Sequence, residues 1–144
     1  MGNMIDIDDE GVKYLKLVED GSMRLTQLDI RELQKAKGAI RASIDILMDQ
    51  LGLSPDDILK VHLTGSFGGQ VDVDSVLELG MIPPVHQAVV EPVANGAGLG
   101  AAMFLTDEGF ALGEKLAEDA VQVDLDQDEH FNLRYTSAMY LRES

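Results

Sequence analysis

A glycine-dense turn at residues 62–70 (His-Leu-Thr-Gly-Ser-Phe-Gly-Gly-Gln) is the stretch of this sequence best suited to ligand binding. Before it, apolar Val61 and Leu63 alternate with polar residues, which is typical of a half-buried strand. The glycines that follow remove side chains where a ligand could approach the backbone. A turn of this kind after a strand often contacts phosphate or ribose, but it is also common as a plain structural turn.

A second candidate surface lies on the helix that apolar residues at three- and four-residue steps predict over residues 27–51. Lys37 stands within this apolar stripe, and Gln34 and Arg41 lie along the same edge of the helix. One interpretation is that these side chains lay their stems over the rim of the core and send their polar heads to water. The other is that they flank a flat ligand, with a cation over an aromatic ring and an amide at its edge.

Two further patterns could bind ions. Residues 94–102 predict a helix of small residues with Asn95 as its N-cap, and this cap either only closes the helix or leaves N–H groups facing an anion. Asp124, Asp126, Asp128 and Glu129 form an acidic cluster that lacks the glycine and terminal glutamate of an EF-hand loop. We expect a solvated acidic turn there and no metal residues in the chain.

The composition excludes several kinds of chemistry. The 144 residues contain no cysteine, so the chain has no disulfide, no thiolate nucleophile and no cysteine ligand for zinc or an iron–sulfur cluster. His62, His86 and His130 are far apart in the sequence, which disfavours a histidine metal site. The net charge of −15 disfavours nucleic acid and anionic membranes as partners. Without a membrane-spanning run or a signal-peptide pattern, a cytoplasmic protein or fragment is expected.

The length fits one domain over residues 1–144, with a strand-rich segment at 1–25 and the remainder at 26–144. The segment predicts a hairpin that turns at the acid-glycine cluster 8–11, a second turn at 20–21, and a brief strand at 23–25. Thr26 with Asp29 predicts a capping box for the long helix, and Gly52 its C-cap. The other expected elements are a turn at 54–57, strands at 58–64, 87–93 and 121–125, and helices at 73–79, 94–102, 107–119 and 129–141.

Three blocks of the sequence together resemble one family. They are residues 26–40 (TQLDIRELQKAKGAI), 63–68 (LTGSFG) and 95–101 (NGAGLGA). Their order and spacing resemble the C-terminal domain of the reductive activators of corrinoid proteins (RACo), over residues 25–141. These proteins belong to the superfamily of acetate and sugar kinases, heat-shock chaperones and actin (ASKHA). The resemblance implies an α/β fold, with α+β as the alternative: part of a ribonuclease H-like lobe in which helices flank a mixed β-sheet.

The resemblance also implies roles for individual residues. The turn at residues 65–69 looks like the adenosine motif of the superfamily, and the helix from Asn95 is similar to the second connecting helix near the interdomain hinge. The helix edge resembles the edge that lines adenine in the chaperones, which favours adenine contact there. The implied nucleotide-binding residues are Gln34, Lys37, Arg41, Gly65, Ser66, Phe67, Gly68, Asn95 and Gly96. No catalytic residue is implied.

The implied cofactor is ATP, with magnesium in the full-length activator, which uses ATP to drive reduction of a cobalt(II) corrinoid to cobalt(I). We find no counterpart before Leu25 of the superfamily's phosphate-binding hairpins and magnesium-binding acids. We therefore expect part of an activator that binds adenosine weakly and does not turn over ATP alone. Its expected partners are a corrinoid protein and the remaining lobe and iron–sulfur module, and a homodimer is also compatible with the pattern.

Two alternatives stay open at this point. The chain could be a non-enzymatic module that keeps the fold and docks on a corrinoid protein or a partner subunit. It could also be a fragment of a sugar-kinase-like protein or of an acyl-CoA dehydratase activator, although these relatives lack the pattern of residues 26–40.

Overall fold

The computed structural model describes residues 5–65 and 71–141. Its helices are α1 (Gln27–Leu51), α2 (Val73–Glu78), α3 (Gly96–Met103), α4 (Asp107–Asp119) and α5 (Phe131–Ala138), with short 3-10 turns η1 (Pro55–Asp57), η2 (Gln87–Val89) and η3 (Leu125–Gln127). Its strands are β1 (Ile5–Ile7), β2 (Lys13–Lys16), β3 (Arg24–Thr26), β4 (Val61–Leu63) and β5 (Val90–Pro92). The predicted helix-and-sheet class takes the form of helices around two small sheets.

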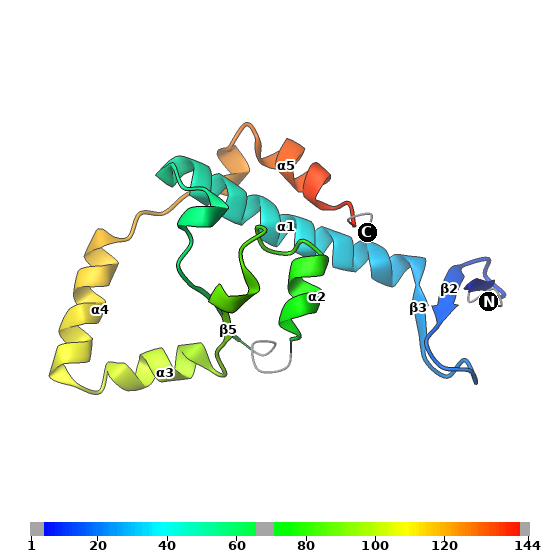
Figure 1. Ribbon diagram of the computed structural model, residues 1–144, viewed down its shortest axis with the longest axis horizontal. Helices are drawn as coiled ribbons and strands as arrows, with labels where there is room; N and C mark the ends of the chain where they lie inside the picture. Colours follow the sequence, from blue (N-terminus) through cyan, green and yellow to red (C-terminus); the bar gives the residue numbers. More distant parts are fainter. Residues whose placement is uncertain (1–4, 66–70, 142–144) are drawn as a thin grey trace.

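The long helix α1 is the central element of the fold, and α2 and α5 lie against it (Figure 1). It begins at the predicted capping box: the backbone N–H of Asp29 donates to Thr26 Oγ1 (3.1 Å), and that of Thr26 donates to Asp29 Oδ2 (2.8 Å). It ends at Gly52, whose φ of 67° is the left-handed conformation that glycine adopts without a Cβ clash. The predicted helix and both of its caps are confirmed.

The first sheet is antiparallel in the order β1-β2-β3 and lies at the N-terminal end of α1 (Figure 1). Tyr14 pairs with Asp6 on one side and with Thr26 on the other. The connecting turns contain Gly11 and Gly21, which have φ values of 81° and 72°. The predicted hairpin, its two turns and the brief third strand are confirmed.

The second sheet is a parallel pair, in which Val61 of β4 pairs with Val90 of β5. The buried core beside it contains Val76, Ile82 and Val90. Both strands are shorter than predicted. Leu59 is 87 % exposed before β4 begins, and the predicted start of β5 is the turn η2, in which His86 Nδ1 accepts a hydrogen bond from Ala88 N (3.1 Å).

The C-terminal half confirms α4 as predicted but corrects its neighbours. The strand predicted at residues 121–125 is wrong: within the described residues this stretch has no strand partner, Val121 is 86 % exposed, and η3 begins at Leu125. Alternating valines form a strand only where a neighbouring strand can pair with them. The predicted helix at 129–141 is shortened to α5, because the Asp128 carboxylate accepts a hydrogen bond from the His130 N–H (2.8 Å) and holds a turn before it.

The inward face predicted for the last helix is confirmed. α5 packs along α1, and its apolar positions Phe131, Tyr135, Ala138 and Met139 are partly buried. The rings of Phe131 and Tyr135 stack with centroids 5.9 Å apart. Helices α3 and α4, in contrast, form an arm that extends away from α1 (Figure 1). None of the helices across residues 5–65 and 71–141 combines the length and apolar composition of a membrane span.

Candidate functional site

The two described residues after β4, Thr64 and Gly65, meet the start of α3 at one edge of the parallel sheet. Strands β4 and β5 run in the same direction, so the residues that follow them emerge side by side. The N–H of Gly96 donates to Thr64 Oγ1 (2.8 Å), and the N–H of Val93 donates to the carbonyl of Leu63 (2.7 Å). The carboxyl edge of parallel strands is where open α/β sheets place their ligands. The structure therefore brings Gly65, Asn95 and Gly96 of the predicted set to one edge.

The two glycines at this edge, Gly65 and Gly96, have different surroundings. Gly65 has a φ of +99°, and among the described residues a Cβ added there would meet nothing within 4 Å, so the backbone of Gly65 is open on this side. A Cβ on Gly96 would lie 2.3 Å from Thr64 Oγ1, so only glycine permits the close approach of α3 to the turn. Ser66, Phe67 and Gly68 lie outside the described residues.

Asn95 is the predicted N-cap of the small-residue helix. Its Oδ1 accepts a hydrogen bond from the N–H of Gly98 (3.2 Å), and its φ of 51° is left-handed, which asparagine tolerates better than most residues. The helix begins at Gly96, two residues later than predicted, because Asn95 is the N-cap and precedes the first helical residue. The N-cap role is confirmed.

Lys37 on the predicted helix edge is buried, with an exposed fraction of 2 %. Its Nζ donates to the carbonyl oxygens of Leu79 (2.7 Å) and Tyr140 (2.8 Å), which lie at the C-terminal ends of α2 and α5. Helix C-termini carry partial negative charge and unpaired carbonyl groups, so one ammonium can satisfy both. The interpretation that the Lys37 ammonium reaches water is wrong, because this ammonium is buried and links α1, α2 and α5 through its hydrogen bonds.

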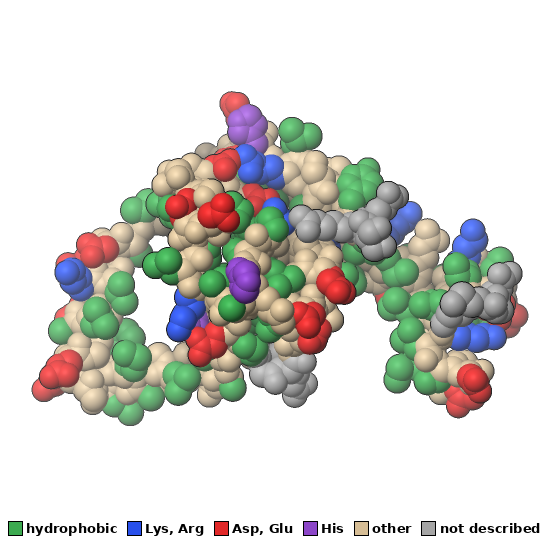
Figure 2. Space-filling model, in the orientation of Figure 1, with side chains coloured by type: hydrophobic (Ala, Val, Ile, Leu, Met, Phe, Trp, Pro, Cys, Tyr) green, Lys and Arg blue, Asp and Glu red, His purple; other side chains and the backbone are tan. Residues whose placement is uncertain are grey.

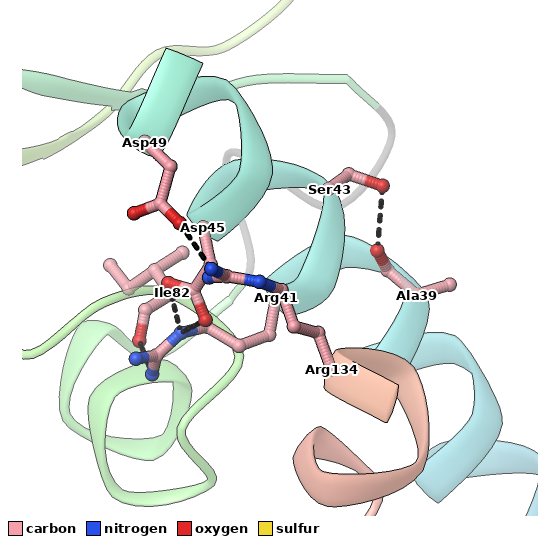
Figure 3. Close-up of polar contacts among 7 residues, drawn as sticks. All are labelled: Ala39, Arg41, Ser43, Asp45, Asp49, Ile82 and Arg134. Carbon is pink, nitrogen blue, oxygen red and sulfur yellow. Dashed lines mark hydrogen bonds and ion pairs between the residues drawn. The ribbon is translucent and has the colours of Figure 1, made fainter. Parts of the chain in front are cut away.

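Arg41 is also engaged within the chain. Its Nε donates to both carboxylate oxygens of Asp45 (2.9 Å each), and its Nη1 donates to the carbonyl of Ile82 (3.1 Å; Figure 3). Lys37 and Arg41 line an open cleft of about 580 Å³ between α1 and α5, whereas Gln34 is half-buried and is not among the described lining residues.

The structure thus places the predicted nucleotide-binding residues in two groups. The carboxyl end of β5 lies toward the N-terminal end of α2, and the C-terminal end of α2 meets α1 through Lys37 (Figure 1). Gly65, Asn95 and Gly96 lie at the carboxyl edge of the β4–β5 pair. Lys37 and Arg41 lie on α1, where α1 meets the C-terminal end of α2. Adenine contact by the helix edge stays a prediction, separate from the turn.

The charged groups near the sheet edge are surface pairs. Glu91 on β5 has its pKa lowered by a hydrogen bond and ion pair with Lys60 (3.1 Å), and His62 lies 3.8 Å from the same carboxylate. The pKa of Asp72 is lowered because it accepts hydrogen bonds from the side chain and N–H of Ser75 at the start of α2. Over the described ranges, no cluster of three or more His, Asp or Glu side chains could hold a metal ion.

Sequence reasoning missed two residues. Thr64 closes the sheet edge through its hydroxyl, and its place directly after the strand was the available signal. Arg134 reaches from α5 to the carboxylate of Asp49 on α1 (Figure 3). No local pattern connects residues so far apart in the sequence.

The family model described as the C-terminal domain of RACo, the ASKHA domain, matches residues 4–144. The chain belongs to this family. The fold agrees with that of a solved reductive activator for a corrinoid, iron–sulfur protein, with a TM-score of 0.82 over 96 % of this chain at 22 % identity.

Two curated relatives are similar in sequence. The chain is 31 % identical over 111 residues to the corrinoid activation enzyme RamQ of Eubacterium limosum, a match that covers 73 % of this chain and 19 % of that protein. It is 30 % identical over 76 residues to a Co(II) methylated amine-specific corrinoid protein reductase of Methanosarcina barkeri, covering 53 % and 14 %. The chain spans less than a quarter of the length of these relatives and of the solved activator, which it covers to 23 %.

Proposed function

We propose that this chain supplies the adenosine-binding part of an ATP-dependent reductive activator of corrinoid proteins. The observation that carries the proposal is the sheet edge where Thr64 is hydrogen-bonded to Gly96 and Gly65 leaves the backbone uncovered. Membership in the RACo C-terminal family and the corrinoid-directed names of the relatives support a part in corrinoid activation.

The residues at this edge fit a ribose and a base better than a triphosphate. Gly65 has no side chain and, among the described residues, nothing lies within 4 Å of its Cβ position, which suits a flat group lying on the backbone. Asn95 and Gly96 form the neighbouring wall, and no lysine or arginine belongs to the described turn and helix start. ATP would place its adenosine here, with its phosphates and magnesium held by a second lobe.

The exposed apolar surface supports a working unit larger than this chain. The arm of α3 and α4 carries large apolar side chains that face solvent, and Figure 2 shows them along its length. They are Leu99, Met103, Phe104, Leu105, Phe110, Leu112 and Leu116, each at least 49 % exposed. Large apolar side chains exposed together on one arm are typical of an interaction site. We propose that a second lobe and an iron–sulfur module complete the activator and that the corrinoid protein is its substrate partner.

Calorimetric titration of the chain with adenosine and with ATP tests the proposal. We expect both ligands to bind weakly and with affinities equal within about threefold, because charge-assisted phosphate contacts, which give large differences, lie outside this edge. No heat from either ligand at millimolar concentration, with the second lobe added, would refute adenosine binding.

Glycine variants make the test specific to the turn. Gly65→Ala places a methyl group in the open face and should weaken adenosine binding by about tenfold or more through lost contact and backbone strain. Gly11→Ala is the matched control, because Gly11 also has a positive φ (+81°) and open space around its Cβ position but lies in the N-terminal hairpin. Equal loss in both variants would point to a general folding effect.

The exposed arm also favours a second candidate, a docking module without nucleotide binding. A pull-down with a corrinoid protein and with the second lobe separates the two functions. Capture that survives Gly65→Ala in a chain that never binds adenosine would support the docking function and overturn the first proposal.

A further inference from the structure

The cleft between α1 and α5 gathers positive charge in a strongly acidic chain. Lys37, Arg41 and Arg134 line it together with a single carboxylate among the described lining residues, that of Asp45, so one cleft contains three of the 11 Lys and Arg residues, against 26 Asp and Glu in the whole sequence. The turn at Gly80 closes one side of the cleft, whose volume of about 580 Å³ is sufficient for a small organic molecule.

The two arginines are held in place before any ligand arrives. Arg41 is anchored by Asp45 and by the Ile82 carbonyl, and Arg134 by Asp49 (Figure 3). The described contacts of Arg41 use two of the five N–H groups of a guanidinium. Because these side chains are already ordered, an anion that binds them costs little further conformational entropy.

The rest of the lining sets the position and the apolar part of a ligand. Leu133 and Tyr140 provide an exposed apolar wall, with 70 % and 73 % exposure. Carboxylates also lie beside both arginines: Asp45 pairs with Arg41 in the cleft itself, and Asp49 and Asp128 line a smaller adjoining hollow of about 220 Å³. A negative group would therefore bind through the guanidinium N–H groups of Arg41 and Arg134 that the described ion pairs do not use, with its apolar body against Leu133.

We propose that this cleft binds a small organic anion, a carboxylate or phosphate carried on an aromatic or apolar body. The site is separate from the sheet edge proposed for adenosine, because α2 lies between them. The overall charge of −15 disfavours long-range attraction of anions, so recognition depends on the contacts inside the cleft.

Titration of the ¹⁵N-labelled chain with benzoate and with phenyl phosphate tests this site. We expect saturable shifts of amide signals along α1 and α5, and the tighter of the two probes identifies the preferred anion. Benzyl alcohol and inorganic phosphate each carry half of the proposed chemistry and should bind at least about tenfold more weakly, because each lacks either the charge-assisted bonds or the apolar contact.

Two variants probe the opposite sides of the cleft. Arg134→Gln should weaken benzoate binding by about tenfold or more, whereas Lys115→Gln, which removes the same charge from an exposed position of α4, should leave it unchanged. Leu133→Asp adds a carboxylate to the apolar wall without touching the α1–α5 ion pairs, and should abolish binding in a chain that still shows the wild-type amide spectrum. Adenosine binding should survive Leu133→Asp, which keeps this test independent of the sheet edge.

The site is refuted if neither probe causes saturable shifts in α1 and α5. It is also refuted if benzyl alcohol binds as tightly as benzoate, or if a folded Leu133→Asp variant binds benzoate like the wild type.

Discussion

Replacing Lys37 by methionine tests whether this residue holds the fold or contacts the nucleotide. The substitution keeps an unbranched apolar stem of similar size and removes only the buried ammonium. The carbonyl groups of Leu79 and Tyr140 then lose a charged donor at 2.7 and 2.8 Å. A buried acceptor left without a donor costs about 1–3 kcal/mol.

Loss of the ammonium costs the Leu79 carbonyl more than the Tyr140 carbonyl. Tyr140 is exposed, so water can replace the ammonium at its carbonyl, whereas Leu79 is half-buried beside the buried Gly80. Removing the desolvated charge also returns part of the cost of burying it. We therefore expect Lys37→Met to lower the free energy of unfolding by about 2 kcal/mol, close to the cost of one unsatisfied carbonyl.

Urea unfolding followed by far-UV circular dichroism measures this loss, since the chain has helices but no tryptophan. Lys35→Met is the matched control: Lys35 lies on the same helix but is exposed and pairs with Glu32, so its loss should cost about 0.5 kcal/mol or less. A Lys37→Met variant as stable as the wild type would refute the structural tie. Adenosine affinity of the folded variant should stay unchanged, and a tenfold loss would favour adenine contact by this helix edge.

Two other predictions concern α1. Gly38→Ala should destabilise the chain, because the new Cβ would lie 2.9 Å from Met139 Cγ and 3.2 Å from the Tyr135 carbonyl. Overpacking costs about 1–3 kcal/mol of stability, which outweighs the gain of about 1 kcal/mol from the higher helix propensity of alanine. Gly100→Ala in α3 would place its Cβ more than 4 Å from any described neighbour and should be neutral or stabilising, so the urea midpoint should fall for Gly38→Ala and not for Gly100→Ala. The pKa of Asp29 is lowered by hydrogen bonds from the backbone and side chain of Thr26, so its carboxylate stabilises the fold above the ordinary aspartate pKa, and this contribution is lost as the pH falls through the lowered value. Asp29→Asn should therefore be less stable than the wild type at neutral pH, and urea midpoints should converge below about pH 4; a constant difference would contradict this origin.

The elements that could be predicted to the residue are those fixed by neighbouring residues. Thr26 and Asp29 lie within one helical turn of each other, and Gly52 needs no partner to favour a left-handed end, so both ends of α1 follow from local chemistry. A strand needs a partner that its own residues do not specify. Residues 121–125 have the composition of a strand, but no strand of the described chain lies beside them.

The candidate site shows the same contrast between features fixed by neighbouring residues and contacts between distant residues. The pattern of α1 marked Lys37 as unusual, but the carbonyls it contacts lie 42 and 103 residues further along the chain, where periodicity gives no information. Gly65 and the Asn95 cap were recognised because each is a local feature, whereas the rest of the predicted glycine turn lies outside the described residues. Their meeting through Thr64 depends on the parallel pairing of β4 with β5, which spacing alone did not specify.

The packing of the domain connects its stability to its proposed function. Two parallel three-residue strands are too short to be stable alone, so the β4–β5 edge depends on the small core around Val76 and Ile82. That core ends where Lys37 joins α2 to α1 and α5, while the α3–α4 arm and the first sheet contribute little to it. A ligand that binds only the folded state stabilises it by mass action, by about 2.7 kcal/mol at a hundredfold excess over its Kd. Under the proposed function, adenosine at the sheet edge or a second lobe on the arm would therefore stabilise a domain whose own core is small, and ligand binding would be coupled to the folding of this domain.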